Sequence, residues 1–138
     1  MAEEGTDHVT LVTDYLAAAQ RARTSREAAD FEAVRGFFHP DATIQLAAAW
    51  GHDPWRVVHR SADEILERLR APINTATSLT TEDVNVVRAG DDVLVEQRST
   101  LHQDGRDLVS MVCHLFTVRD GRIAAIRAYR NDLGLPQG

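Results

Sequence analysis

The stretch HLFTVRDGRIAAIRAY, residues 114–129, decides the fold. Asp120-Gly121 is the strongest hairpin signal in the chain, because both residue types tolerate the positive φ angles of a two-residue turn. The apolar segments on either side predict two antiparallel strands, 108–118 and 123–129. Turn residues at 89–92 and 103–105 separate two further predicted strands, which cover residues 79–88 and 93–102. The second half of the chain is therefore expected to form an antiparallel meander.

The first half of the chain predicts helices. Apolar residues recur at helical spacing over residues 7–23, with Thr6 or Asp7 as the N-cap. A second helix is expected over residues 25–38, and the sequence His39-Pro40-Asp41 is expected to stop it, because proline cannot continue a helix.

Residues 42–47 then predict a short strand, and residues 48–60 predict a long loop. Ser61-Ala-Asp-Glu64 matches the capping-box pattern and opens a third predicted helix that reaches about Leu69. Helices followed by strands predict an α+β fold, with the helices packed on one face of a curved sheet. The length of 138 residues is typical of one domain, with polar tails at 1–6 and 133–138.

Composition excludes several classes of function. The net charge of −6 argues against nucleic acid as the main partner, because phosphate binding needs a basic surface. No apolar run approaches the roughly 20 residues of a membrane helix, and the acidic N-terminus does not resemble a secretory signal. The lone Cys113 cannot form an internal disulfide, so a cytoplasmic location is expected. All 15 basic residues are arginine, which excludes Schiff-base chemistry on lysine and a Walker-type phosphate loop.

Five segments occur in an order and spacing that resemble a known superfamily. They are DYLAAA (14–19), FFHPDATI (37–44), SADEILERL (61–69), VLVEQRSTL (93–101) and HLFTVRDGRIAAIRAY (114–129). Together they resemble the nuclear transport factor 2 superfamily, in the branch that contains ketosteroid isomerases, SnoaL-like polyketide cyclases, scytalone dehydratase and limonene epoxide hydrolase. The resemblance implies a cone-shaped, curved antiparallel sheet with about three helices on its concave face. It also implies a homodimer formed through the outer face of the sheet.

The resemblance assigns roles to two residues. In ketosteroid isomerases a tyrosine on the first helix and a protonated aspartic acid on a late strand form the oxyanion hole. Tyr15 matches the first position and His114 the second, and scytalone dehydratase also carries a histidine at the position of His114. The general-base aspartate of the isomerases falls on Leu46.

The catalytic arginine and two aspartates of limonene epoxide hydrolase fall on Gln97, Ser99 and Ala128. The carboxylates of both best-known catalytic sets are therefore absent from these positions.

The chemistry of the matched residues agrees with a catalytic pair. A neutral imidazole at His114 has one donor and one acceptor nitrogen and can take up a proton near neutral pH. The Tyr15 ring is expected to point inward, so that its hydroxyl needs a partner, either His114 or a ligand oxygen. The alternatives are a core histidine that bonds to the main chain and a purely structural tyrosine.

Strand periodicity predicts further residues of the pocket. Gln97 and Ser99 share one face of their strand, which the resemblance makes the concave face, while Glu96 and Arg98 point outward. A shift of one residue would exchange the two faces. Phe116 shares the face of His114.

On the last strand, Ile126 is expected to line the same pocket. Arg130 and Asp132 are expected near its mouth, where they could contact an anionic or hydroxylated substrate. The alternative for this pair is a surface salt bridge.

The segment Trp50-Gly-His52-Asp53-Pro-Trp55 concentrates both tryptophans of the chain around a histidine and a carboxylate. It predicts a lid that contributes apolar area and acid/base groups to the substrate site, or two rings that only plug the open end of the cone. His52, Asp53 and His59 lack metal-ligand spacing, so no metal site is expected.

These observations predict an enzyme that needs no cofactor and acts on a small lipophilic substrate, resembling a polyketide, steroid or terpene. General acid/base catalysis of cyclisation, dehydration or isomerisation is the expected chemistry. One alternative is a domain of the same fold that binds a ligand or assembles without catalysis. A further alternative is an epoxide hydrolase with a different acid/base set, since Asp53 and Asp132 are both expected near the mouth.

Overall fold

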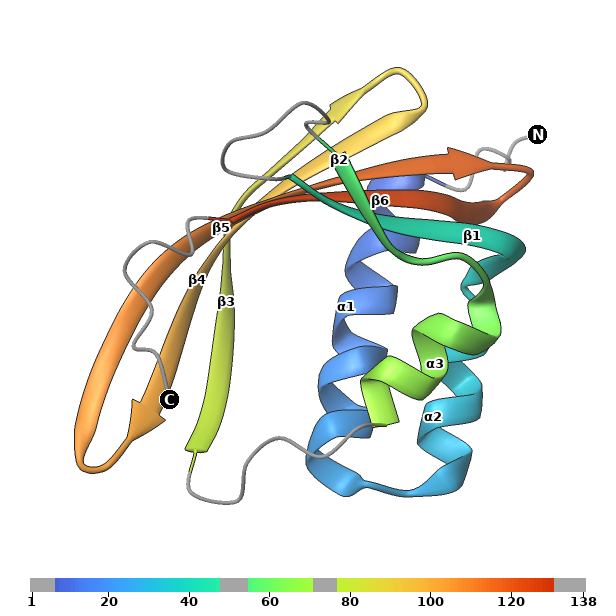
Figure 1. Cartoon of the computed structure of the whole chain (residues 1–138). Helices are drawn as coiled ribbons and strands as arrows, with labels where there is room; N and C mark the ends of the chain where they lie inside the picture. Colours follow the sequence, from blue (N-terminus) through green and yellow to red (C-terminus); the bar gives the residue numbers. More distant parts are fainter. Residues whose placement is uncertain (1–6, 48–54, 71–76, 131–138) are drawn as a thin grey trace.

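The computed structural model describes residues 7–47, 55–70 and 77–130. In these residues three helices and six strands follow one another (Figure 1). They are α1 (His8–Ser25), α2 (Ala28–Arg35), β1 (Phe38–Ala47), β2 (Trp55–His59), α3 (Ala62–Arg70), β3 (Thr77–Ala89), β4 (Asp92–Gln103), β5 (Arg106–Arg119) and β6 (Arg122–Arg130). The α+β fold class is confirmed.

The strands form one curved, open sheet in the order β2-β1-β6-β5-β4-β3. The meander expected from the sequence is confirmed for β3 to β6, where each strand pairs antiparallel with the next. The sheet as a whole is mixed, however, because β1 runs parallel to β6. These two strands are far apart in the sequence, so no hairpin turn fixes their relative direction.

The turns of the meander have the backbone that their sequences predict. Asp120 and Gly121 have φ angles of 55° and 72°, and Asp104 and Gly105 have φ angles of 53° and 76°. Two successive positive φ angles are the signature of the tight turn that matches the twist of a β-hairpin. These turns fix the pairing register of β4, β5 and β6, and so they decide which residues share a face.

Two helix starts are also confirmed. The Asp7 carboxylate accepts a hydrogen bond from the Val9 N–H at 3.1 Å and caps α1. At α3 the Ser61 hydroxyl accepts from the Glu64 N–H at 3.1 Å, while the Glu64 carboxylate accepts from the Arg60 N–H at 2.9 Å. These bonds satisfy N–H groups that have no partner within the helix.

The prediction for the end of the second helix was wrong. Helix α2 stops at Arg35, and the expected stop signal lies inside strand β1, which begins at Phe38 rather than at residue 42. Proline is compatible with this strand because the register between β1 and β6 shifts between Phe38 and Thr43. Pro40, which has no N–H to donate, lies in this irregular stretch.

The prediction of a loop over residues 48–60 was wrong for its second half. Residues 55–59, Trp-Arg-Val-Val-His, form strand β2, which pairs antiparallel with β1 at the edge of the sheet. Aromatic and β-branched residues favour this extended conformation. Residues 48–54 lie outside the described part of the chain.

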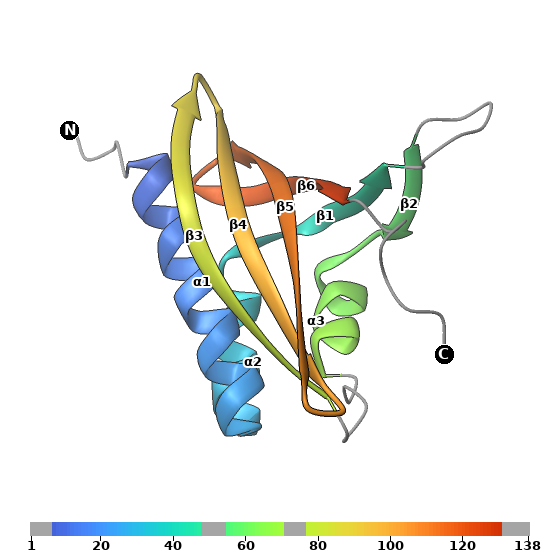
Figure 2. The same ribbon diagram turned by 90° about the vertical axis from the view of Figure 1, so that its left-hand side faces the viewer.

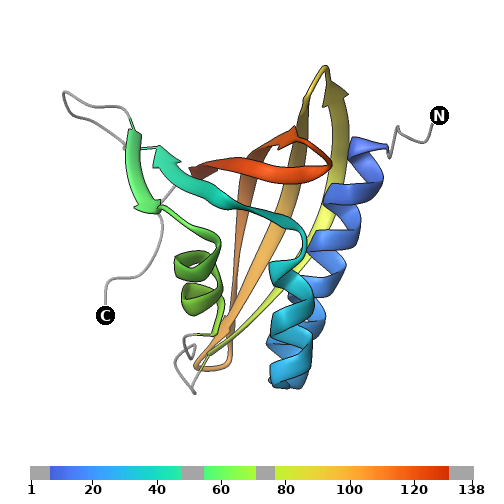
Figure 3. The same ribbon diagram turned by 90° about the vertical axis from the view of Figure 1, so that its right-hand side faces the viewer.

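All three helices cover the same face of the curved sheet, whose strands β3, β4 and β5 lie in front of the helices in Figure 2 and behind them in Figure 3. The core fills the space between helices and sheet. Its buried members from the helices are Val12, Tyr15, Ala18, Ala19, Ala22, Phe31, Val34, Ala62, Ile65 and Leu66, and those from the sheet include Val93, Val95, Phe116, Val118, Ile123 and Ile126. The helix-covered side is therefore the concave face, and the opposite side is the outer face.

Candidate functional site

Residues that pair directly across neighbouring strands point to the same side of the sheet. Each set of paired residues therefore forms a row across the concave face. His114 lies in one row with Val95 and Ala128, and Leu46 continues that row onto β1. The neighbouring row contains Phe116. Val95 and Phe116 are buried in the core, which confirms the face assigned to His114.

Tyr15 packs into an aromatic cluster on this face. Its ring meets those of Phe37, Phe38 and Phe116 edge-on, with centroid distances of 6.2, 5.1 and 5.8 Å. Burial raises the pKa of the Tyr15 hydroxyl above its usual value, and nearby Arg23 opposes that shift. The hydroxyl therefore stays protonated and can act as a hydrogen-bond donor.

His114 contacts the same Phe116 ring. The two ring centroids are 6.2 Å apart and the rings are close to perpendicular, at 81°. Among the described residues no hydrogen bond joins the Tyr15 hydroxyl to His114 or to any other side chain. Tyr15 and His114 thus both contact the ring of Phe116, but no hydrogen bond joins them.

Gln97 faces the same side and is only 5% exposed. Its amide nitrogen donates a hydrogen bond to the Asp83 carboxylate on β3, with an N···O distance of 2.9 Å. Asp83 pairs with Gln97 in the ladder, and the register shifts immediately afterwards, between Asp83 and Asn85. Sequence analysis missed Asp83, because this irregularity breaks the alternation along β3.

A row of hydroxyl groups follows Gln97 along the face. Ser99 is paired with Thr81 on one side and with Ser110 on the other, and all three residues are half-buried. The concave face therefore changes from apolar around Phe116 to polar at Gln97 and in the row of Ser99.

The structure describes only some of the other predicted pocket residues. Ile126 is buried and pairs with Phe116, so it lies on the concave face as expected. Arg130 occupies the register position opposite Val112, which also belongs to that face. Trp50, His52, Asp53 and Asp132 lie outside the described residues.

The placement of Trp55 corrects its expected role. The ring centroids of Trp55 and Tyr129 are 5.2 Å apart, and the Arg127 guanidinium lies 5.9 Å from the centroid of the Trp55 ring. Tyr129 pairs with Cys113, the neighbour of His114, so it points away from the concave face. Trp55 is therefore part of the outer face and does not line the site of His114.

His59 is a second histidine on the concave side. It pairs with Ile44, in the row of Ile126 and Phe116. Its Nε2 is buried and has no hydrogen-bond partner among the residues that the structure describes. Burial lowers the pKa of His59, Arg68 on α3 lowers it further, and Glu64 partly offsets the shift. Sequence analysis considered this residue only as a metal ligand, because its segment was predicted to be a loop.

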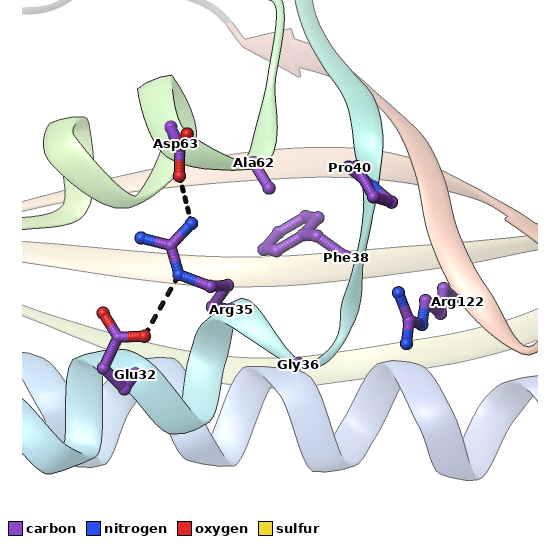
Figure 4. Close-up of a pocket in the computed structure, with 8 residues that line it drawn as sticks. All are labelled: Glu32, Arg35, Gly36, Phe38, Pro40, Ala62, Asp63 and Arg122. Carbon is purple, nitrogen blue, oxygen red and sulfur yellow. Dashed lines mark hydrogen bonds and ion pairs between the residues drawn. The ribbon is translucent and has the colours of Figure 1, made fainter.

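A pocket of about 430 Å³ lies apart from these residues, among α2, α3 and the starts of β1 and β6 (Figure 4). Arg35 forms ion pairs there with Glu32 and Asp63, so its charge is already balanced. None of the predicted site residues lines this pocket. Its lining residues are Glu32, Arg35, Gly36, Phe38, Pro40, Ala62, Asp63 and Arg122.

The outer face is more apolar than the sequence predicts. Glu96 and Arg98 do point outward as expected, since the residues that alternate with them on β4 are buried. Large apolar side chains are exposed beside them. Those at outer-face positions of the strand ladder are Val87, Val109, Met111 and Tyr129. We call these four residues the outer apolar patch.

Within the described part of the chain, no group of three or more histidine, cysteine, aspartate or glutamate side chains could hold a metal ion. The helices at 8–25, 28–35 and 62–70 are too short or too polar to cross a membrane.

A family model for the SnoaL-like domain matches residues 12–126. The chain belongs to the SnoaL-like family. A search of curated proteins found no match for this SnoaL-like chain.

Solved structures share the fold of this SnoaL-like chain. An NTF2-like protein from Burkholderia xenovorans LB400 has a TM-score of 0.70 and 21% identity, and the match covers 93% of this chain and 92% of that one. A candidate SnoaL-like polyketide cyclase from Jannaschia sp. CCS1 has a TM-score of 0.68 and 17% identity, with coverage of 91% and 89%. An LEH-like epoxide hydrolase from M. tuberculosis has a TM-score of 0.57 and 20% identity, with coverage of 86% and 84%. At these identities the similarity establishes the fold alone. The chemistry has to be inferred from the residues of the site.

Proposed function

We propose that this SnoaL-like chain is an enzyme that acts without a cofactor on a small lipophilic substrate resembling a polyketide, steroid or terpene. The reaction is a cyclisation, dehydration or isomerisation by general acid/base catalysis. The observation that carries the proposal is the contact of both Tyr15 and His114 with the ring of Phe116. A proton donor and a proton acceptor beside an apolar surface suit a substrate with a carbonyl group.

The three reactions share a first step, the removal of a proton from the carbon next to a carbonyl group. His114 accepts that proton, while the Tyr15 hydroxyl donates a hydrogen bond to the carbonyl oxygen as it becomes negative. The raised pKa of Tyr15 supports this role, because the hydroxyl keeps its proton at every working pH.

The resulting enolate then has three outcomes. The proton returns to a different carbon in an isomerisation, or it leaves with a β-hydroxyl group as water in a dehydration. In a cyclisation the enolate carbon attacks a second carbonyl group of the same substrate, whose oxygen takes up the proton. Gln97 and Ser99 orient the substrate in all three cases, since both lie on the concave face.

A different class of function, ligand binding without catalysis, is the second candidate. One observation favours it: Leu46 and Ala128 share the row of His114, and both stand where related enzymes carry a carboxylate. A site without these carboxylates has fewer groups that can move a proton.

We further propose that the chain forms a homodimer through the outer face of the sheet. The outer apolar patch supports this, because large apolar side chains exposed on one face are typical of protein interfaces. A second copy of the chain would cover them.

The test of catalysis uses 1-tetralone, a lipophilic ketone whose α-protons exchange with solvent. In D2O the wild-type protein is expected to accelerate this exchange, followed by NMR, and His114→Ala to slow the catalysed exchange about 10²–10⁴-fold. His102→Ala, on the outer face, is the matched control. Binding of the ketone without any acceleration would contradict the catalytic proposal and support the binding domain.

A further inference from the structure

Gln97 has one fixed partner and one free hydrogen-bonding atom. The side chain is almost completely buried, and its Nε2 donates to Asp83 Oδ1 at 2.9 Å. No donor among the described residues bonds to its Oε1. This oxygen is not among the side-chain atoms that are buried without a partner, so it stays accessible to a donor group of a ligand.

Asp83 determines which end of this amide remains available. An ionised carboxylate has no proton to donate, so only the NH2 end of Gln97 can face it. The Oε1 atom therefore points away from Asp83. Without this carboxylate the two ends of the amide could exchange, and Gln97 would present a donor or an acceptor equally well.

The neighbouring polar groups do not make this distinction. The hydroxyls of Thr81, Ser99 and Ser110 can each donate or accept, because a hydroxyl rotates to suit its partner. Gln97 is held in one orientation. Among these described side chains it is therefore the one that distinguishes a ligand that donates a hydrogen bond from a ligand that only accepts one.

We propose that Asp83 is a specificity-determining residue that holds Gln97 as a hydrogen-bond acceptor, so that the site takes apolar ring compounds carrying a hydroxyl donor. This inference rests on the proposed function, because it assumes that the concave face binds a small lipophilic ligand. Asp83 acts through Gln97 and does not itself contact the ligand.

The test compares two probes of the same ring, 2-naphthol and 2-methoxynaphthalene, of which only the first has a hydroxyl donor. Calorimetry on the wild-type protein is expected to show about tenfold tighter binding of 2-naphthol, the value of one good hydrogen bond. In Asp83→Asn the ratio is expected to fall towards one, because asparagine can donate to Gln97 and allows its amide to turn over. Asp107→Asn, the same change on the outer face, keeps the wild-type ratio.

A second measurement does not depend on the variant folding or on a ligand. In the wild-type protein the side-chain NH2 protons of Gln97 are expected to exchange with solvent more slowly than those of a free glutamine amide, and equally fast if no bond joins Gln97 to Asp83. Fast exchange of these protons, equal binding of both probes, or an unchanged ratio in Asp83→Asn overturn the inference and leave the proposed function standing. Failure of the wild-type protein to bind either probe overturns both.

Discussion

The ring centroids of Tyr15 and Phe38 are 5.1 Å apart in an edge-to-face arrangement. This is the shortest of the three aromatic contacts of Tyr15. Edge-to-face packing contributes to stability beyond the area that the rings bury. The contact uses the ring of Tyr15 and not its hydroxyl, so the packing role and the chemical role of this residue can be separated by experiment.

Tyr15→Phe keeps the ring and removes only the hydroxyl. Because that hydroxyl makes no hydrogen bond to the described side chains, its loss is expected to change the free energy of unfolding by less than about 1 kcal/mol. Proton exchange of 1-tetralone is expected to slow at least about tenfold, since the donor to the carbonyl oxygen is lost. Urea unfolding and NMR measure the two effects. A variant with full exchange activity would remove Tyr15 from the mechanism.

Phe116→Ala is expected to destabilise the protein strongly. Phe116 is 1% exposed and contacts both Tyr15 and His114, so truncation leaves a cavity in the core. The expected loss is about 3–5 kcal/mol in the free energy of unfolding, measured with urea. Val84→Ala, at an exposed position of β3 outside the outer apolar patch, is the control and should change stability by no more than about 0.5 kcal/mol. Similar losses in the two variants would contradict the core position of Phe116.

His59 is expected to make the protein less stable in mild acid. Its pKa is lowered in the folded state, mainly by burial, so folding favours the neutral ring. Its contribution is complete above the ordinary histidine pKa of about 6.5 and is lost as the pH falls towards the lower folded value. His59→Gln should therefore lose less thermal stability than the wild type between pH 7.5 and 5.5. His39→Gln is the control, and equal losses in all three proteins would refute the role of His59.

Met111→Glu is expected to weaken the proposed dimer. Met111 is a member of the outer apolar patch, and the charge of a carboxylate there would lose its hydration in the interface, although Arg98 lies opposite on the neighbouring strand. Sedimentation equilibrium should show a dimer for the wild type and at least a tenfold weaker association for the variant. Ala17→Glu, on the exposed side of α1, adds the same charge elsewhere and should leave the dimer intact. A monomeric wild-type protein would disprove the interface.

The part of the site on β4 and β5 could be predicted because the turns were predictable. The turns at Asp104-Gly105 and Asp120-Gly121 fix the register, and alternation then places Gln97, His114 and Phe116 on one face. Asp83 could not be predicted in this way, because the register shift between Asp83 and Asn85 lies between it and the turn from which the alternation on β3 is counted.

Edge strand β2 was also not predicted from the sequence. Its five residues do not alternate clearly between polar and apolar, and the strand exists because β1 offers an unpaired edge. The same pairing takes Trp55 to the outer face and His59 to the concave side, and neither position can be read from local sequence.

By itself the sequence determined the α+β class, the meander and which residues of β4 and β5 share a face, because capping and turn preferences are local properties of the chain. The tertiary structure decided which residues meet across strands. The contact of Tyr15 and His114 with Phe116, the bond between Gln97 and Asp83, and the parallel pairing of β1 with β6 all join distant segments. Such contacts depend on how the sheet curves around the helices, and no local preference specifies that curvature.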